Sequence, residues 1–107
     1  MDRFRRLCDA ARRRMLYLGL GNVAVRHGDG LTGWPERGPY DRILLTGAVD
    51  EVPDVLLPQL AKGGVLIAPL QTADAQVLLR LGADGTQERL AIAHPLPALV
   101  EGRSRAL

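Results

Sequence analysis

Residues 28–33 (GDGLTG) have the spacing G-x-G-x-x-G, which in dinucleotide-binding proteins forms the turn that cradles a pyrophosphate. That chemistry requires a helix directly after the glycines, because the N–H groups of its first turn face the phosphates. The next residues, 34–39 (WPERGP), contain two prolines and a glycine. Because no helix propagates through such a stretch, the motif is not predicted to bind a pyrophosphate.

Asp29 lies between two of these glycines, directly after a segment that is predicted to be a strand. An acid at the carboxyl end of a parallel strand faces the crevice in which open α/β sheets bind ligands. Its carboxylate can accept a hydrogen bond from an exocyclic amine, and the neighbouring Gly30 lets a flat ring approach the backbone. Gly-Asp-Gly is also common in surface turns, and spacing alone favours that interpretation.

The elements that must position this acid begin with a helix. Between residues 4 and 18 apolar residues recur at helical spacing, which predicts a helix of about four turns with one buried stripe. Gly19 follows, and glycine suits the left-handed conformation that ends many helices. Cys8 is predicted to be a small core residue. The stripe consists of Phe4, Leu7, Cys8, Ala11, Met15 and Leu18.

Three strand-prone segments come next, at residues 22–26 (NVAVR), 41–46 (DRILLT) and 64–70 (GVLIAPL). Valines alternate in the first. The second and third contain continuous aliphatic runs, which are typical of parallel strands that are buried on both faces.

A short helix is predicted between the last two of these strands, at residues 52–60, where Pro53 can start it. Residues 75–81 and 88–94 are strand-prone and are joined by turn residues at 83–86, which predicts an antiparallel hairpin. The order of elements is typical of the second part of an α/β fold.

Size and charge restrict the class of protein. A chain of 107 residues supports one small domain, and its 14 basic and 12 acidic residues give a net charge of +2. Six arginines lie at residues 3–14, without the interleaved aromatic residues of a nucleic-acid-binding surface. We therefore expect a solvated helix face and no nucleic-acid partner.

The single cysteine, the two histidines and the hydropathy of the chain restrict the class of protein further. With Cys8 as the only cysteine, no disulfide within the chain or multi-cysteine metal site is possible. His27 and His94 have no partners at metal-ligand spacing and are predicted to be solvent-exposed strand ends, so no metal is expected. No apolar run approaches the roughly 18 residues of a membrane span, and the N-terminus does not resemble a signal or transit peptide. A cytoplasmic protein without a membrane partner is expected.

Nearly the whole chain resembles the protein-L-isoaspartate O-methyltransferase family, with the family's elements in order and with matching gaps. Residues 2–15 resemble its segment after the second strand, and residues 95–102 more loosely resemble its C-terminal strand. The motifs that carry the resemblance are Gly-Asp-Gly at 28–30, Gly-Trp-Pro at 33–35, Pro-Tyr-Asp-Arg-Ile at 39–43, Thr-Gly-Ala at 46–48, Glu-Val-Pro at 51–53 and Gln-Leu with Gly-Gly at 59–64.

This resemblance implies an α/β fold: a partial class I S-adenosylmethionine-dependent methyltransferase (Rossmann-like) sheet that lacks its first two strands and has a C-terminal antiparallel hairpin. Residues 1–107 would form the C-terminal part of a single methyltransferase-like domain. The family's glycine-rich cofactor loop and the segment that grips the isoaspartyl carboxylate would precede Met1. The two missing strands would separate residues 22–26 from 41–46 by ~14 Å and leave unpaired strand edges.

The resemblance also implies methyl transfer from S-adenosylmethionine to isoaspartyl carboxylates in damaged proteins. By position, Asp2 matches the acid that binds the cofactor ribose, and Asp29 and Gly30 match the pair beside the adenine. Thr46 and Gly47 match the end of a strand near the crevice. No catalytic residue is expected, because the sulfonium donor is already activated and positioning supplies most of the rate.

Three hypotheses follow. In the first, the chain is the C-terminal half of an isoaspartyl methyltransferase, and it binds the cofactor poorly alone. In the second, it is a non-catalytic α/β remnant that associates with another chain, such as a separately encoded N-terminal half, through its exposed strand edges. In the third, least favoured hypothesis, the arginine-rich helix binds nucleic acid, and its affinity falls steeply with salt.

Overall fold

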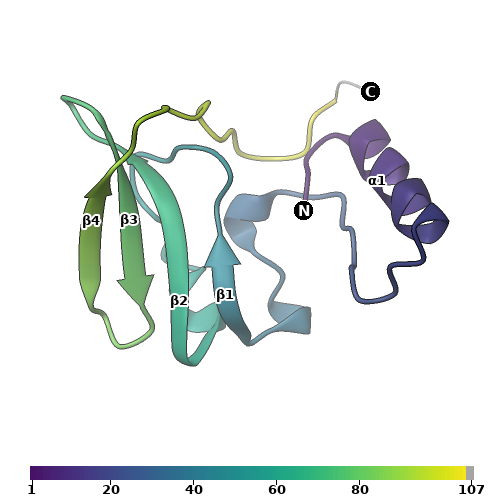
Figure 1. Cartoon of the computed structure of the whole chain (residues 1–107), viewed down its shortest axis with the longest axis horizontal. Coiled ribbons are helices and arrows are strands. Elements are labelled where there is room, and N and C mark those ends of the chain that lie inside the picture. The colour runs from purple at the N-terminus through teal and green to yellow at the C-terminus, as the bar shows by residue number, and fades with distance from the viewer. Residues whose placement is uncertain (106–107) are drawn as a thin grey trace. The chain divides into compact units, whose positions relative to one another are not determined.

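The structure, a computed structural model, describes residues 1–105. The chain divides into two compact units. Unit 1 consists of residues 1–31 together with 101–107, and unit 2 consists of residues 32–100. Figure 1 shows one helix at the N-terminal end of the chain and a sheet built from the middle of the sequence.

Unit 1 is built on helix α1 (Arg5–Tyr17), which confirms the predicted helix. The helix ends at a glycine in the left-handed conformation, because Gly19 has a φ of +68°. The Gly19 N–H donates to the Leu16 carbonyl at 3.2 Å, and the Leu20 N–H donates to the Met15 carbonyl at 2.9 Å. This pair of hydrogen bonds is the Schellman motif, which satisfies two of the last carbonyls of the helix.

The predicted apolar stripe of α1 is present but mostly uncovered. Cys8 is buried, as expected, and its thiol donates to the Asp2 carbonyl at 3.4 Å. By contrast, Leu7 is 56% exposed and Leu18 is 62% exposed. The expectation of a buried stripe is therefore wrong for these positions, since the described residues of unit 1 form no sheet on which the helix could pack.

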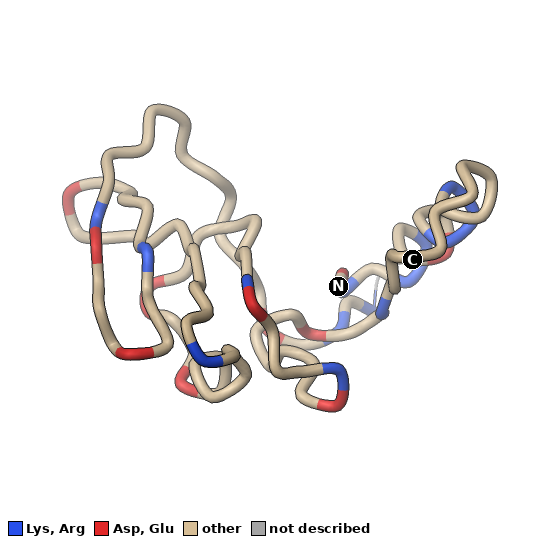
Figure 2. Tube along the Cα trace, turned by 60° about the horizontal axis from the view of Figure 1, so that its bottom comes forward, with Lys and Arg blue, Asp and Glu red and all other residues tan. Residues whose placement is uncertain are grey.

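The basic residues gather in unit 1. Nine of the 14 Lys and Arg residues belong to it but only four of the 12 Asp and Glu residues, and Figure 2 shows the arginines along α1. Arg12 forms an ion pair with Asp9 at 2.9 Å, and both side chains are nearly half exposed. Arg12 also donates to the Val25 carbonyl at 3.0 Å. Exposed pairs of this kind contribute little to stability, as expected for a solvated helix face.

The predicted strand at residues 22–26 is not formed. Pairing is limited to one isolated parallel bridge between Asp2 and His27. In it, the Asp2 N–H donates to the Arg26 carbonyl at 3.1 Å, and the Gly28 N–H donates to the Asp2 carbonyl at 2.9 Å. A strand forms only where a neighbouring strand pairs with its backbone along its length. For residues 22–26, the described residues supply such a neighbour only at the carboxyl end, where Asp2 pairs with His27.

Unit 2 contains a four-stranded sheet in the order β1-β2-β3-β4. Strands β1 (Tyr40–Leu44) and β2 (Leu60–Gln71) are parallel. Strands β3 (Gln76–Gly82) and β4 (Gln87–Ala91) continue the sheet with antiparallel pairing. The parallel pair and the C-terminal hairpin are thus confirmed, and each lies within a few residues of its predicted bounds.

The core of unit 2 lies on β2, the strand with a neighbour on each side. Leu66 and Ala68 have no exposed surface, as predicted for a strand that is buried on both faces. The same prediction is wrong for β1. This strand is at the edge of the sheet, and Leu44 is 65% exposed. Its continuous aliphatic run therefore lacks the second neighbour that such runs usually have.

The predicted helix at residues 52–60 is reduced to single turns. The Leu56 N–H donates to the Pro53 carbonyl at 3.1 Å, and the Gln59 N–H donates to the Leu56 carbonyl at 3.1 Å. The second turn is the 3₁₀ helix η3 (Leu57–Gln59). Pro58 explains the difference, because it lacks an N–H and disfavours the helical conformation of the residue before it.

The loop before β1 contains two more short 3₁₀ helices, η1 (Gly30–Thr32) and η2 (Pro35–Arg37). Within unit 2 it is fastened by the buried side chain of Gln59. The Gln59 amide accepts from the Trp34 N–H at 2.9 Å and donates to the carbonyls of Thr32 at 3.1 Å and Val55 at 3.0 Å. We call this group of contacts the Gln59 clasp.

The turn of the C-terminal hairpin contains an acid, Asp84, whose pKa is lowered by hydrogen bonds. The Thr86 hydroxyl donates to the Asp84 carboxylate at 2.7 Å and the Thr86 N–H donates to it at 3.0 Å, and these bonds lower the pKa of Asp84. Because the folded-state pKa lies below the unfolded-state pKa, the resulting stabilisation is present above the unfolded-state value. It is lost as the pH falls through the folded-state value.

We therefore expect Asp84→Asn to flatten part of the acid limb of a stability-versus-pH curve. Asparagine keeps an oxygen that can accept from Thr86 but has no charge to titrate. Urea denaturation at pH values from 2 to 7 (about five points) would measure this. If the wild-type and Asp84→Asn curves had the same acid limb, the assigned contribution of this turn would be wrong.

Candidate functional site

The five residues predicted to bind the cofactor are divided between the units. Asp2, Asp29 and Gly30 belong to unit 1, whereas Thr46 and Gly47 belong to unit 2. Unit 1 therefore brings together the two acids that the sequence analysis assigned to the ribose and the adenine.

Asp2 is held by backbone contacts on both sides. Its N–H and carbonyl form the bridge to His27, and its carboxylate accepts from the Phe4 N–H at 2.8 Å. The side chain is half-buried. This carboxylate is thus fixed by the backbone of Phe4, the residue directly before α1.

Asp29 is also half-buried, and its carboxylate oxygens are held from two sides. Oδ1 accepts from the Leu31 N–H at 2.9 Å, and Oδ2 accepts from the Gly102 N–H at 2.9 Å. The preceding Gly28 is buried. The acid is therefore positioned by backbone on both of its oxygens, which a simple exposed turn would not require.

Gly30 begins η1 and is exposed. A Cβ atom built on Gly30 would have no neighbour within 4 Å, and its φ is not positive. Neither packing nor backbone conformation among residues 1–105 therefore explains a glycine here.

Gly47, in contrast, has a packing reason to be glycine. A Cβ atom at this buried position would lie 2.6 Å from the Leu99 side chain and 2.8 Å from the Pro97 carbonyl oxygen. The next residue, Ala48, forms an isolated parallel bridge with Ala98. Thr46, which follows β1, is exposed.

The looser resemblance of residues 95–102 to a C-terminal strand is not matched by a strand in the structure. The described pairing of this segment consists of the single bridge of Ala98 to Ala48. Pro95 and Pro97 have no N–H groups, so the first part of this segment cannot donate to a continuous ladder.

Three residues that contact the predicted acids or their neighbours were not predicted from the sequence: Arg3, His27 and Gly102. His27, predicted to be solvent-exposed, is half-buried, and its Nε2 lies 2.9 Å from the Arg3 carbonyl oxygen. Arg3 in turn contacts residues 101–102 through its guanidinium group. Gly102 holds Asp29, as described above. These contacts join residues 24 to 99 positions apart, so no local spacing could have indicated them.

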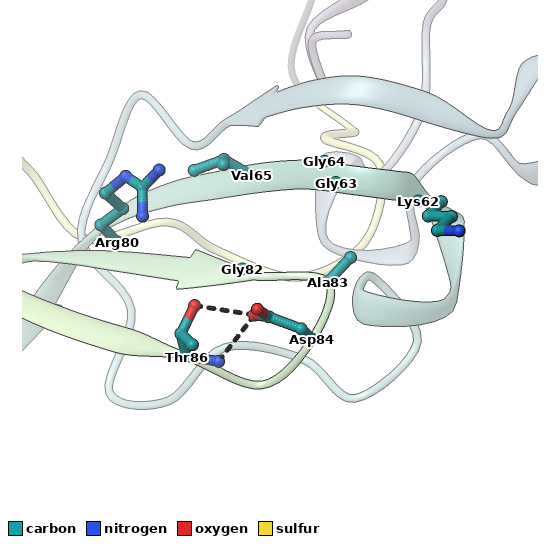
Figure 3. Close-up of a pocket in the computed structure, with 9 residues that line it drawn as sticks. All are labelled: Lys62, Gly63, Gly64, Val65, Arg80, Gly82, Ala83, Asp84 and Thr86. Atoms are coloured by element: carbon teal, nitrogen blue, oxygen red, sulfur yellow. Dashed lines mark hydrogen bonds between the residues drawn. The ribbon is translucent and has the colours of Figure 1, made fainter.

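A separate hollow of about 710 Å³ lies on unit 2, at the end of the β2–β3 pair. Figure 3 shows that its lining includes Gly63 and Gly64 on β2, Arg80 on β3, and the hydrogen-bonded pair Asp84 and Thr86. None of the five predicted cofactor-binding residues lines it. Its charged groups are of mixed sign, and we assign no ligand to it.

Residues 1–105 contain no group of three or more His, Cys, Asp or Glu side chains that could hold a metal ion. Within the same residues, no helix has the length and apolar character needed to cross a membrane.

Comparisons with solved structures confirm the predicted fold class. A protein-L-isoaspartate O-methyltransferase structure matches 87% of this chain and 33% of its own, with a TM-score of 0.69 and 33% identity. A structure from Plasmodium falciparum, described as a protein-L-isoaspartate O-methyltransferase in complex with S-adenosyl-L-homocysteine, matches 92% of this chain and 50% of its own, with a TM-score of 0.76 and 22% identity. The sheet is thus part of a Rossmann-like methyltransferase fold.

Comparisons with curated protein sequences give the same family. The protein-L-isoaspartate O-methyltransferase of Maricaulis maris is 42% identical over 110 residues, which cover 100% of this chain and 51% of the relative. The protein-L-isoaspartate O-methyltransferase 1 of Marinobacter nauticus is 47% identical, and the match covers 92% of this chain and 46% of the relative. The chain thus spans about half the length of these relatives. Residues 1–93 also match the sequence model of this family, so the chain belongs to the protein-L-isoaspartate(D-aspartate) O-methyltransferase family.

Proposed function

We propose that this chain is the C-terminal part of a single methyltransferase-like domain. Together with the remainder of that domain, it transfers a methyl group from S-adenosylmethionine to isoaspartyl carboxylates in damaged proteins. The observation that carries the proposal is the family match over residues 1–93. Because the chain spans about half of its relatives, we expect it to supply part of the active site only.

The nucleoside part of the cofactor is assigned to unit 1. Asp29 would accept a hydrogen bond from the exocyclic amine of adenine, and Asp2 would accept from the vicinal hydroxyls of the ribose. The absence of any neighbour at the Gly30 Cβ position supports a close approach of the flat ring to the backbone at that residue. The residues of unit 1 therefore fit the polar groups of an adenosine.

Thr46 and Gly47 are assigned to the crevice end of the strand they follow. The position of Thr46, two residues beyond the end of β1, supports a contact with the cofactor, since open α/β sheets bind ligands beyond the carboxyl ends of parallel strands. For Gly47 the packing against Leu99 is an independent reason for glycine. Its proposed role is therefore to let residues 97–99 pass close to this end of β1.

The bound cofactor would supply an activated methyl group on a sulfonium. This chain's own contribution to the reaction would be binding and orientation, which can supply a large part of a rate acceleration. No side chain is proposed to act as an acid, a base or a nucleophile. We propose a cytoplasmic protein with no metal, membrane or nucleic-acid partner, on the sequence arguments given above.

A second candidate function is association without catalysis. It is favoured by the edge strand β1, which pairs with β2 alone among residues 1–105 and exposes 65% of Leu44. An unpaired, aliphatic strand edge readily accepts another strand. The partner would be a polypeptide that supplies the remaining strands of the fold, whether or not the assembly has activity.

Mixing experiments separate the two candidates. The chain would be combined with the portion of the Maricaulis maris relative that it does not match, and methyl-ester formation on an isoaspartyl peptide would be measured. The proposed enzyme predicts activity in the mixture and none in either part alone. In the active mixture, Asp29→Asn should raise the KM for S-adenosylmethionine by about tenfold or more, the usual effect of losing a hydrogen bond to a charged group.

A complex that forms but shows no turnover would instead favour association alone. Activity of the chain unaided would contradict the proposal that it supplies only part of the site.

A further inference from the structure

The C-terminal segment of unit 1, residues 101–104, is tied to Arg3. The Arg3 guanidinium donates from Nε to the Gly102 carbonyl at 3.0 Å and from Nη2 to the Glu101 carbonyl at 3.5 Å. In the other direction, the Ser104 N–H donates to the Arg3 carbonyl at 3.0 Å. Side chain and backbone of one residue therefore hold the segment at three points.

Arg3 itself is held in place. Its carbonyl also contacts Nε2 of His27 at 2.9 Å, and its guanidinium carbon lies 5.4 Å from the centre of the Phe4 ring. It is next in sequence to Asp2, whose backbone forms the bridge to His27. A side chain that is fixed in this way loses little further freedom when it orders the segment that it contacts.

Residues 101–104 also contact Asp29, through Gly102. Gly102 has a φ of +78°, which points its N–H and carbonyl in directions that other residues rarely achieve. Its carbonyl accepts from Arg3, while its N–H donates to Oδ2 of Asp29 at 2.9 Å. The Leu31 N–H holds Oδ1 at the same distance. The two backbone donors together fix the plane of the carboxylate.

We propose that Arg3 is a positioning residue for nucleoside binding: it holds Gly102 so that the Gly102 N–H orients the Asp29 carboxylate toward the ligand's amine. The inference rests on the proposed function, because it takes Asp29 as the acid beside the adenine. An acceptor that is oriented before binding gains affinity, because less order remains to be imposed when the ligand arrives. Arg3 touches no ligand in this account and acts through Gly102 alone.

The test uses the full 107-residue chain labelled with ¹⁵N, and compares the wild type with Arg3→Met, Arg3→Lys and Asp29→Asn. The first readout is the hydrogen-exchange rate of two backbone amides, Gly102 and Leu31. In Asp29→Asn both amides should exchange about five- to tenfold faster, since each loses a charged acceptor. In Arg3→Met only the Gly102 amide should do so.

Arg3→Lys is the matched control, because an ammonium group can still donate to the carbonyls of residues 101–102. It should restore most of the protection of Gly102, which a loss of general stability in Arg3→Met would not explain. Equal exchange of Gly102 in the wild type, Asp29→Asn and Arg3→Met would overturn the proposal. So would an equal increase at Leu31 in Arg3→Met.

The second readout is the response of the same two amides to S-adenosylhomocysteine. Both should shift in the wild type and in Arg3→Lys, and the half-saturating concentration should rise several-fold in Arg3→Met. If Arg3→Met responded like the wild type, positioning by Arg3 would be overturned. If no variant responded while exchange behaved as predicted, the nucleoside assignment of the proposed function would fail in this chain, although the link from Arg3 to Asp29 would stand.

Discussion

Replacing Gly33 with alanine is expected to lower the free energy of unfolding of unit 2 by about 3–5 kcal/mol. Gly33 has a φ of +69°, a conformation that costs an L-residue roughly 1–2 kcal/mol. A Cβ atom would also clash with Oε1 of Gln59. Because Gln59 is buried and bound at three points in the Gln59 clasp, moving it would break the hydrogen bonds that its amide makes with the backbone of Thr32 and Trp34, at about 1–1.5 kcal/mol each.

Gly63→Ala is the matched control for the clasp. Gly63 lies in the same unit and has a similar φ of +74°, but a Cβ atom there would have no neighbour within 4 Å. It should therefore cost only the backbone strain, about 1–2 kcal/mol. Urea denaturation followed by tryptophan fluorescence suits both variants. Trp34 is the only tryptophan in the sequence, and its backbone N–H is part of the clasp. Equal losses in the two variants would show that the clasp contributes nothing.

Leu66→Ala is expected to destabilise unit 2 by about 2–5 kcal/mol, the range for deleting a fully buried leucine. Leu66 has no exposed surface and lies on β2, where it pairs with Ile43 on β1 and Leu81 on β3. Its removal leaves a cavity at the centre of the sheet. Since small domains are stable by only about 5–15 kcal/mol, this loss would be a large share of the free energy of unfolding of unit 2.

The control for Leu66 is a leucine of the same sheet that lies near the surface. Leu90 on β4 is 56% exposed, and Leu90→Ala should change the free energy of unfolding by less than about 1 kcal/mol. Denaturation midpoints by Trp34 fluorescence and by far-ultraviolet circular dichroism would compare the two variants. A shift for Leu66→Ala no larger than that for Leu90→Ala would contradict the assignment of β2 as the core of the unit.

Elements with local signals were predictable from the sequence. The spacing of apolar residues located α1, and Gly19 marked its end, since both depend on neighbouring residues only. The aliphatic run of β2 and the strand-prone segments on either side of the 83–86 turn located the strands that have partners within the chain. In these cases local preference and tertiary pairing agree.

Most of the wrong predictions share one physical cause, which is dependence on a neighbour that the described residues do not supply. Residues 22–26 have the composition of a strand but pair only where Asp2 meets His27. Leu7 on α1 and Leu44 on β1 have the pattern of buried residues but remain largely exposed. The helix predicted at residues 52–60 is an exception with a local cause, because Pro58 lies within it and limits it to single turns.

The candidate site was predictable only through the resemblance to a family. Spacing alone favoured a surface turn at Asp29, and no pattern pointed to Arg3 or Gly102. Their contacts depend on the return of the chain's C-terminal segment to residues near its start, 73 positions away from Asp29 and 99 from Arg3. Such long-range contacts are set by the fold and leave no local trace in sequence.

Calorimetric titration of the 107-residue chain with S-adenosylhomocysteine tests the central claim most directly. The claim is that unit 1 supplies the acids for the nucleoside but only part of the cofactor site. We predict binding no tighter than about 1 mM, which corresponds to roughly 4 kcal/mol of binding free energy. A dissociation constant near 1 µM, or roughly 8 kcal/mol, would show that these residues form a complete site on their own and would contradict the account.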